Sequence, residues 1–102
     1  MAEVHALVIE CGRRAGDDLP PRASGARIVC YAPGADLEAA IAAASAVIRD
    51  AGLSLRTVTA HGTLADRLAK GVLTASERLL MERVHRIGRV VIAELTPTYE
   101  QS

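Results

Sequence analysis

Apolar residues recur with two different periods along this chain, and the two periods predict four strands and three helices. Stretches in which apolar residues alternate or run together predict the strands, at residues 3–11, 26–32, 53–61 and 89–96. Stretches in which they recur every three or four residues predict the helices, at residues 37–51, 64–70 and 75–87. Because the short second helix leads directly into the third, we count the two as one unit and write the order as β-β-α-β-α-β.

The clearest stretch, residues 26–56, predicts a strand, a turn, an amphipathic helix and a second strand. Asp36 stands at the expected N-cap, where its carboxylate accepts hydrogen bonds from the free N–H groups of the first turn. Gly52 stands where a left-handed residue ends a helix. A helix of this length between two strands is typical of a right-handed parallel crossover. Since an acid at the cap would repel a phosphate, we interpret this β-α-β unit as a scaffold.

The two later helices also have start and stop signals. Thr63 is the expected N-cap of the short helix and Gly71 its end. Thr74 and Glu77 have the spacing of a capping box, with a hydroxyl at the cap and a carboxylate three residues on. Gly88 is expected to close the last helix.

The first and last strands are apolar on both faces. In the first strand, Val4 and Ala6 alternate with Leu7 and Ile9. This pattern suits a strand that is covered on two sides. The last strand is apolar on both faces except for Glu94, and we expect it in the centre of the sheet.

These elements predict a single α+β domain over residues 1–102, with a four-stranded mixed sheet and two main helices on one face. The arrangement is similar to the ferredoxin-like group of sandwiches or a variant of it, although that fold places a hairpin between its β-α-β halves and here the extra strand comes first. Residues 12–25 hold glycines, consecutive prolines and charges, and nothing in them fixes a geometry, so we expect a mobile loop. Residues 97–102 are expected to form a polar tail.

Composition and charge restrict the partners. Half of the residues are hydrophobic, yet there is no Phe or Trp and only two Tyr, so a site that holds a flat ring by stacking is not expected. Twelve basic residues balance twelve acidic ones, and we therefore expect neither nucleic acid nor membrane as a partner. No apolar run approaches the roughly 20 residues that span a bilayer, and the N-terminus lacks a basic signal region, so we expect a cytoplasmic protein.

The cysteines and histidines give no metal or cofactor signature. Cys11 and Cys30 do not make a disulfide framework, and we interpret them as reduced core residues, with a reactive or paired role as the alternative. His5, His61 and His85 have no partner at metal-ligand spacing, so neither a metal nor a cofactor is expected. His5 stands among apolar strand residues and is interpreted as a structural histidine.

His61 is the single histidine that points to function, because it ends a strand next to a glycine and a helix start, where ligands collect in α/β sheets. Its imidazole fits a general acid or base, or a group that hydrogen-bonds a ligand. A polar residue that only finishes a strand is the alternative. Glu94 is a charge inside an apolar strand, and Arg13 and Arg14 follow the first strand. These three are the candidate ligand contacts.

We therefore expect a small homodimeric module that binds a small molecule or another protein and has no catalytic activity. A homodimer is expected because helices on one face would leave an apolar face that two-fold pairing can bury. The alternative is a small cofactor-free enzyme with His61 as general acid or base, in a pocket at the end of the third strand or at a subunit interface. The sequence leaves the choice between these two open and does not identify the ligand, substrate or partner.

Overall fold

The computed structural model of the protein describes residues 3–14 and 17–99. It contains the expected elements in the expected order: β1 (Glu3–Arg13), β2 (Gly25–Gly34), α1 (Leu37–Asp50), β3 (Leu53–Thr63), α2 (Leu64–Lys70), α3 (Ala75–Ile87) and β4 (Val91–Thr98). The α+β class is therefore confirmed. Within the described residues, no helix combines the length and the apolarity needed to cross a bilayer.

The four strands form one sheet in the order β3-β1-β2-β4, and every neighbouring pair is antiparallel. The predicted mixed sheet is therefore wrong, and the ferredoxin-like order is not confirmed. β3 runs in the direction of β2, as a crossover through α1 requires. The two are not neighbours, because β1 lies between them and pairs antiparallel with both. β4 was expected in the centre and is instead an edge strand. In a sheet with helices on both sides, a strand that is apolar on both faces can lie in the centre or at an edge.

The helices cover opposite faces of the sheet, so the prediction of two main helices on one face is wrong. The buried core under α1 consists of Leu7, Ile9, Cys11, Ala26, Ile28, Cys30, Ala32, Ala40, Ala44, Ile48 and Leu53. The buried core under α3 consists of Val4, Ala6, Tyr31, Met81 and Val84. Along β1 and β2 the members of the two cores alternate, and successive side chains of a strand face opposite sides. The two-sided apolar pattern of β1 is thus explained by one helix on each face.

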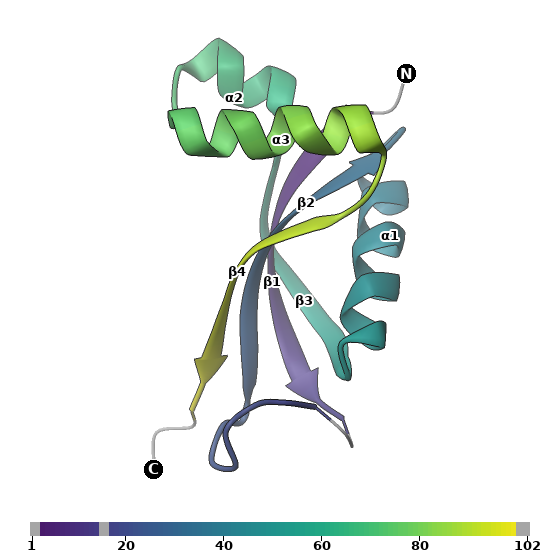
Figure 1. Ribbon diagram of the computed structural model, residues 1–102, viewed down its shortest axis with the longest axis vertical. Helices are drawn as coiled ribbons and strands as arrows, with labels where there is room; N and C mark the ends of the chain where they lie inside the picture. The colour runs from purple at the N-terminus through teal and green to yellow at the C-terminus, as the bar shows by residue number, and fades with distance from the viewer. Residues whose placement is uncertain (1–2, 15–16, 100–102) are drawn as a thin grey trace.

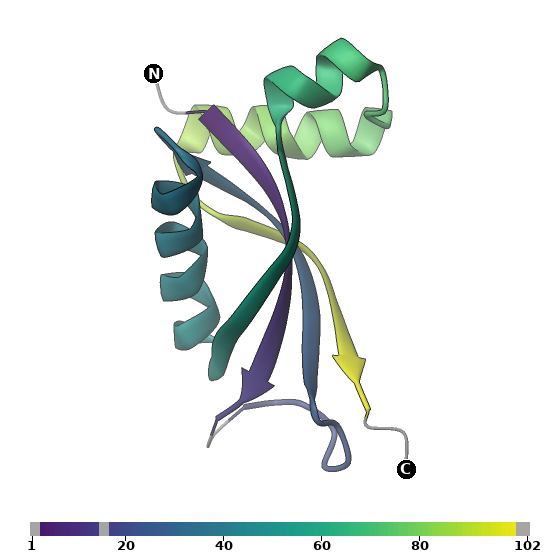
Figure 2. The same cartoon turned by 180° about the vertical axis from the view of Figure 1, so that it is seen from behind.

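Only part of the face under α3 is covered. α1 runs along one side of the strands, whereas α2 and α3 lie across their upper end, and none of the helices in the described part of the chain lies over the lower part of that second face (Figures 1 and 2). We call this uncovered part the open face. By strand register its side chains are Val8 and Glu10 of β1, Arg27 and Val29 of β2, Thr57 and Ala60 of β3, and Glu94 and Thr96 of β4. Val8 and Val29 are partly buried and the other six are exposed, so this surface is mostly polar and not the apolar face that we expected.

Both edges of the sheet carry features that hinder pairing with another strand. The register of β3 against β1 shifts twice, and Arg56 and Thr59 have no residue opposite them. β4 contains Pro97, which was expected in the polar tail and instead pairs with Ala26. A proline is tolerated there because the outward N–H groups of an edge strand have no partner in the sheet.

The predicted helix ends are confirmed. The backbone N–H groups of Ala39, Asp66 and Glu77 donate to the side-chain oxygens of Asp36, Thr63 and Thr74, at 2.8, 3.1 and 3.1 Å. The glycines at the three expected stops have positive φ: Gly52 at 83°, Gly71 at 66° and Gly88 at 65°. Local chemistry therefore determines where each helix begins and ends.

The connection from β1 to β2 is organised by Arg13. Its Nη1 donates to the carbonyl oxygens of Pro20 and Ala23 at 2.8 and 3.0 Å, and its Nη2 lies 2.7 Å from Oδ1 of Asp17. The hydrogen bond from Arg13 lowers the pKa of the Asp17 carboxyl below its ordinary value. The premise that nothing in this connection fixes a geometry is therefore wrong, while its mobility stays a prediction. Residues 15 and 16 lie outside the described residues.

Cys11 and Cys30 are buried free thiols in the core under α1, as interpreted from the sequence. Burial raises the pKa of both, and that of Cys30 reaches about 11. Both thiols are therefore protonated near neutral pH and act as small apolar residues.

Candidate functional site

A groove of about 400 Å³ lies where α3 borders the open face. Val8, Val29 and Ala60 lie along its sheet side, and Leu80 borders it from α3. Six polar or charged residues also line it: Tyr31, His61, Arg67, Ser76, Glu77 and Glu94. Apolar surface with a few polar groups is the usual composition of a ligand site.

The fold gives the groove a direction. α3 is anchored by Met81 and Val84, which are buried against the upper end of the strands. It lies across the strands (Figure 1), so the groove between the helix and the sheet also runs across the strands. Residues of β3 and α2 therefore line one end of the groove, and residues of β4 line the other.

The β3 end of the groove is built around Arg67. Its Nη1 lies 2.9 Å from Oε2 of Glu77, and the two side chains are 35% and 31% exposed. This ion pair joins α2 to α3, and α2 itself buries no residue. A Cβ placed on Gly62 would lie 3.8 Å from Nε of Arg67, so the arginine side chain lies over the glycine. The guanidinium is thereby held at the groove while part of it still faces solvent.

Tyr31 supplies a buried ring next to the groove, since the residue is only 3% exposed. Burial raises the pKa of its hydroxyl, and the carboxylates of Glu77 and Glu94 raise it further. The hydroxyl therefore stays protonated near neutral pH, where it donates or accepts a hydrogen bond and is not a nucleophile.

His61 is exposed and lies between two hollows. The second hollow, of about 460 Å³, shares His61, Gly62 and Arg67 with the groove. His5 also lines this second hollow and is buried, with its Nε2 3.2 Å from the carbonyl oxygen of Gly34. That contact confirms the structural role predicted for His5.

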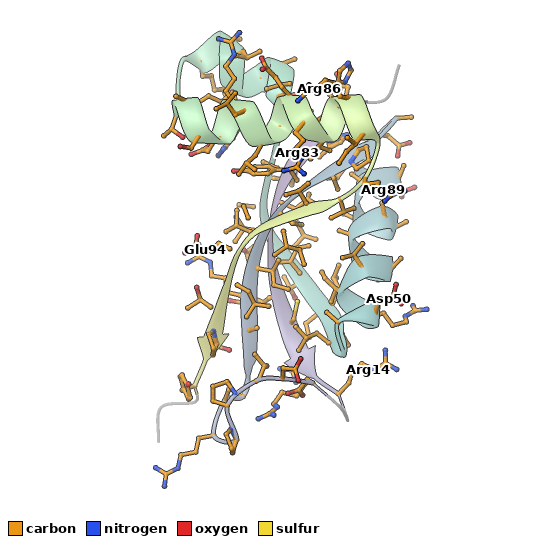
Figure 3. The ribbon with its side chains drawn as sticks, viewed as in Figure 1. Arg14, Asp50, Arg83, Arg86, Arg89 and Glu94 are labelled. Atoms are coloured by element: carbon orange, nitrogen blue, oxygen red, sulfur yellow. The ribbon has the colours of Figure 1, made fainter. Side chains whose placement is uncertain are left out.

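The structure brings some of the candidate residues together and separates others. His61 and Glu94 line the same groove from opposite edge strands. Arg14 lies at the far, lower end of the molecule, and Arg13 next to it is occupied by the β1–β2 connection (Figure 3). Neither arginine is near the groove. No pattern in the sequence indicated Tyr31, Arg67 or Glu77 as site residues, because only the position of α3 brings them together.

Other clusters on the protein offer less. In residues 3–14 and 17–99, no three side chains from His, Cys, Asp and Glu lie close enough to hold a metal ion. Arg83, Arg86 and Arg89 are close in sequence, but their side chains extend in different directions around the end of α3 (Figure 3). The groove is therefore the place where unlike chemical groups converge.

The fold and groove define an α+β domain with an antiparallel sheet, one helix on one face and a helical pair across the end of the other. Residues 4–99 match the family described as a domain of unknown function (DUF8846), and the chain belongs to that family. Compared with the curated proteins and with the solved structures, the chain matches none.

Proposed function

We propose that this protein is a non-catalytic binding module whose ligand occupies the groove between α3 and the open face. The observation that carries this proposal is the placement of α3 across one end of the sheet. That placement leaves a groove of about 400 Å³ between the helix and the sheet. In it, an apolar floor meets side chains from β2, β3, β4, α2 and α3. A small molecule or a short peptide segment fits such a site.

The state of the nucleophilic side chains supports binding over catalysis. Cys11 and Cys30 lie in the core on the other face of the sheet, and burial raises their pKa values. Tyr31 borders the groove, but its pKa is also raised. Enzymes that use such groups as nucleophiles lower these pKa values instead.

A fragment titration tests the binding site. Neutral fragments such as cyclohexanol and N-methylacetamide are added to ¹⁵N-labelled protein, and we expect the amide signals of Val8, Val29 and Ala60 to shift. Ala60→Trp should fill the groove and abolish these shifts, because Ala60 is exposed and lines it. The matched control is Ala46→Trp on the exposed side of α1, which should leave the shifts intact. Shifts confined to other surfaces would refute the proposal.

We also propose that the module is a homodimer, now on grounds of shape and not of an apolar face. A helix with its side chains is about 10–12 Å thick, and packed sheets are about 10 Å apart. Two open faces can therefore pack with their strands reversed, so that each α3 lies beyond the end of the other sheet. Because this packing covers the groove, the ligand and the second chain compete for it. Light scattering at micromolar concentration should give the mass of two chains, and Val29→Asp should give one. Glu38→Lys, on exposed α1, is the control that keeps the dimer, whereas a monomeric wild type contradicts it.

A cofactor-free enzyme with His61 as general acid or base is the second candidate. It is favoured by the exposed position of His61 at the border of two hollows, since proton transfer needs a base within reach of the substrate. A panel of p-nitrophenyl esters and of ketones exchanged in D₂O tests it. Turnover that is lost in His61→Ala would support the enzyme, and turnover that is unchanged in this variant would exclude His61.

A further inference from the structure

We infer that the ligand of the groove carries opposite charges at its two ends, with its cationic group at Glu94 and its anionic group at Arg67. This inference rests on the proposed binding function and specifies the class of ligand. Its basis is the order of the strands under the groove, which places the remaining donors of the paired Arg67 at one end of an apolar floor and the carboxylate of Glu94 at the other.

The distance between the two ends follows from the sheet. The strand order β3-β1-β2-β4 puts three strand spacings between the two ends. Neighbouring strands are about 4.8 Å apart, so the ends are separated by about 14 Å. Val8 of β1 and Val29 of β2 form the floor between them. After the reach of the side chains is subtracted, a ligand with its charges about 10 Å apart spans this floor.

The end at β3 suits a carboxylate. Arg67 uses Nη1 for its ion pair with Glu77, which leaves Nε and Nη2 as further donors. These two nitrogens form the planar fork that binds a carboxylate with two hydrogen bonds. Ser76 lies on the adjoining wall and adds a hydrogen-bonding group, whereas the side chain of His61 leaves β3 on the α1 face, beside Leu7. The ion pair with Glu77 also fixes the guanidinium in place before the ligand arrives.

The end at β4 suits an ammonium group. Glu94 is exposed on the open face, and among the described residues it takes part in no ion pair. Its neighbour across the ladder is Val29; Arg27, diagonally opposite on the same face, shares a separate hollow with Glu94 and forms no ion pair with it. Since Arg67 and Glu77 neutralise each other, Glu94 is the charge that remains in the groove. A ligand cation at this end is therefore favoured by Coulomb attraction.

A short peptide with free termini has the required dimensions. An extended chain rises about 3.3 Å per residue, so three residues place the terminal ammonium and carboxylate about 10 Å apart. The floor consists of Val and Ala side chains, which favours small apolar ligand side chains. Trialanine is therefore the probe of choice.

Calorimetric titration with four forms of trialanine tests the inference. The forms are the free zwitterion, the N-acetyl form, the C-terminal amide and the doubly capped peptide. We expect the zwitterion to bind about tenfold or more tighter than the doubly capped form, because each exposed charge pair contributes a modest factor. Each singly capped form should have an intermediate affinity.

Variants assign the two ends. Glu94→Gln should weaken binding of the zwitterion and of the amide by about threefold to tenfold and leave the N-acetyl form unchanged. Arg67→Gln should weaken binding of the zwitterion and of the N-acetyl form and leave the amide unchanged. Because Arg67 also joins α2 to α3, Arg67→Lys serves as the second variant, which keeps the charge and loses the fork. Arg49→Gln, in the last turn of α1, is the matched control that changes none of the four affinities.

The outcomes separate the inference from the proposed function. Equal affinity for all four peptides overturns the inference. If no peptide binds while neutral fragments still shift Val8 and Val29, the inference fails and the binding site stands. If neither peptides nor fragments reach the groove, both fail.

Discussion

The contact between the end of β2 and the start of α1 gives the sharpest prediction about stability. Gly34 is buried at the end of β2. A Cβ built on it would lie 2.5 Å from the backbone nitrogen of Ala40 and 3.0 Å from the carbonyl carbon of Ala39. Backbone atoms cannot rotate away as a flexible side chain can. Gly34→Ala therefore forces α1 to move away from the sheet.

The cost follows from the packing of α1. An ordinary contact at this position begins near 3.4 Å, so the helix start must move by roughly 1 Å. Overpacking of this kind costs about 1–3 kcal/mol. Restricting the unfolded chain offsets about 0.4–1 kcal/mol of it. We expect a net loss of about 1–2 kcal/mol in the free energy of unfolding, which corresponds to a fall in Tm of roughly 5–15 °C for a domain of this size.

Urea denaturation followed by circular dichroism at 222 nm measures this loss. Gly62→Ala is the matched control, because its Cβ would meet only the side chain of Arg67, at 3.8 Å, so the stability should stay unchanged or rise by up to about 1 kcal/mol. If Gly34→Ala is as stable as the wild type, the close approach of α1 to β2 is wrong. The assignment of α1 to its own face of the sheet would then need revision.

Three further predictions concern the cores, the thiols and the β1–β2 connection. Met81→Ala should lose about 2–4 kcal/mol in urea denaturation, because Met81 is fully buried under α3, whereas Leu79→Ala, at a site 68% exposed, should change stability by less than about 0.5 kcal/mol. Burial raises the pKa of Cys30 to about 11, so the thiol loses its proton at lower pH in the unfolded chain than in the folded one. The free energy of unfolding should therefore fall as the pH rises from about 9 to 11. Cys30→Ala should flatten this dependence, and an equal slope of stability against pH in both proteins would contradict the reasoning. Arg13→Gln should speed tryptic cleavage after Arg22, because Arg13 holds the connection by hydrogen bonds to several carbonyls; mass spectrometry would show the new fragments, and unchanged rates would argue against this role.

The elements of the fold could be predicted from the sequence because each depends on local chemistry. Side chains at Asp36, Thr63 and Thr74 cap the helices where the pattern placed them. The alternation in β1 correctly predicted cover on both faces. The order of the strands depends instead on which long-range pairs form, and no local pattern encodes that. Pro97 is the clearest example, since it looks like a strand end and is compatible with an edge strand.

The candidate site could be predicted only in part. His61 and Glu94 were notable because a polar residue at a strand end and a charge in an apolar strand are both unusual. Their meeting in one groove depends on β3 and β4 being the two edges of the sheet under α3. Tyr31 and Arg67 look ordinary in sequence, one as a strand residue and one as a helix surface residue. They become site residues because α2 and α3 cross the upper end of the sheet.

Intermolecular nuclear Overhauser effects between trialanine and the protein test whether the groove under α3 is the binding site of this domain. We predict effects between the methyl groups of the peptide and those of Val8 and Val29, which lie on the floor of the groove. Effects that instead connect the peptide to the exposed surface of α1, or to the β1–β2 connection around Arg13, would contradict the claim.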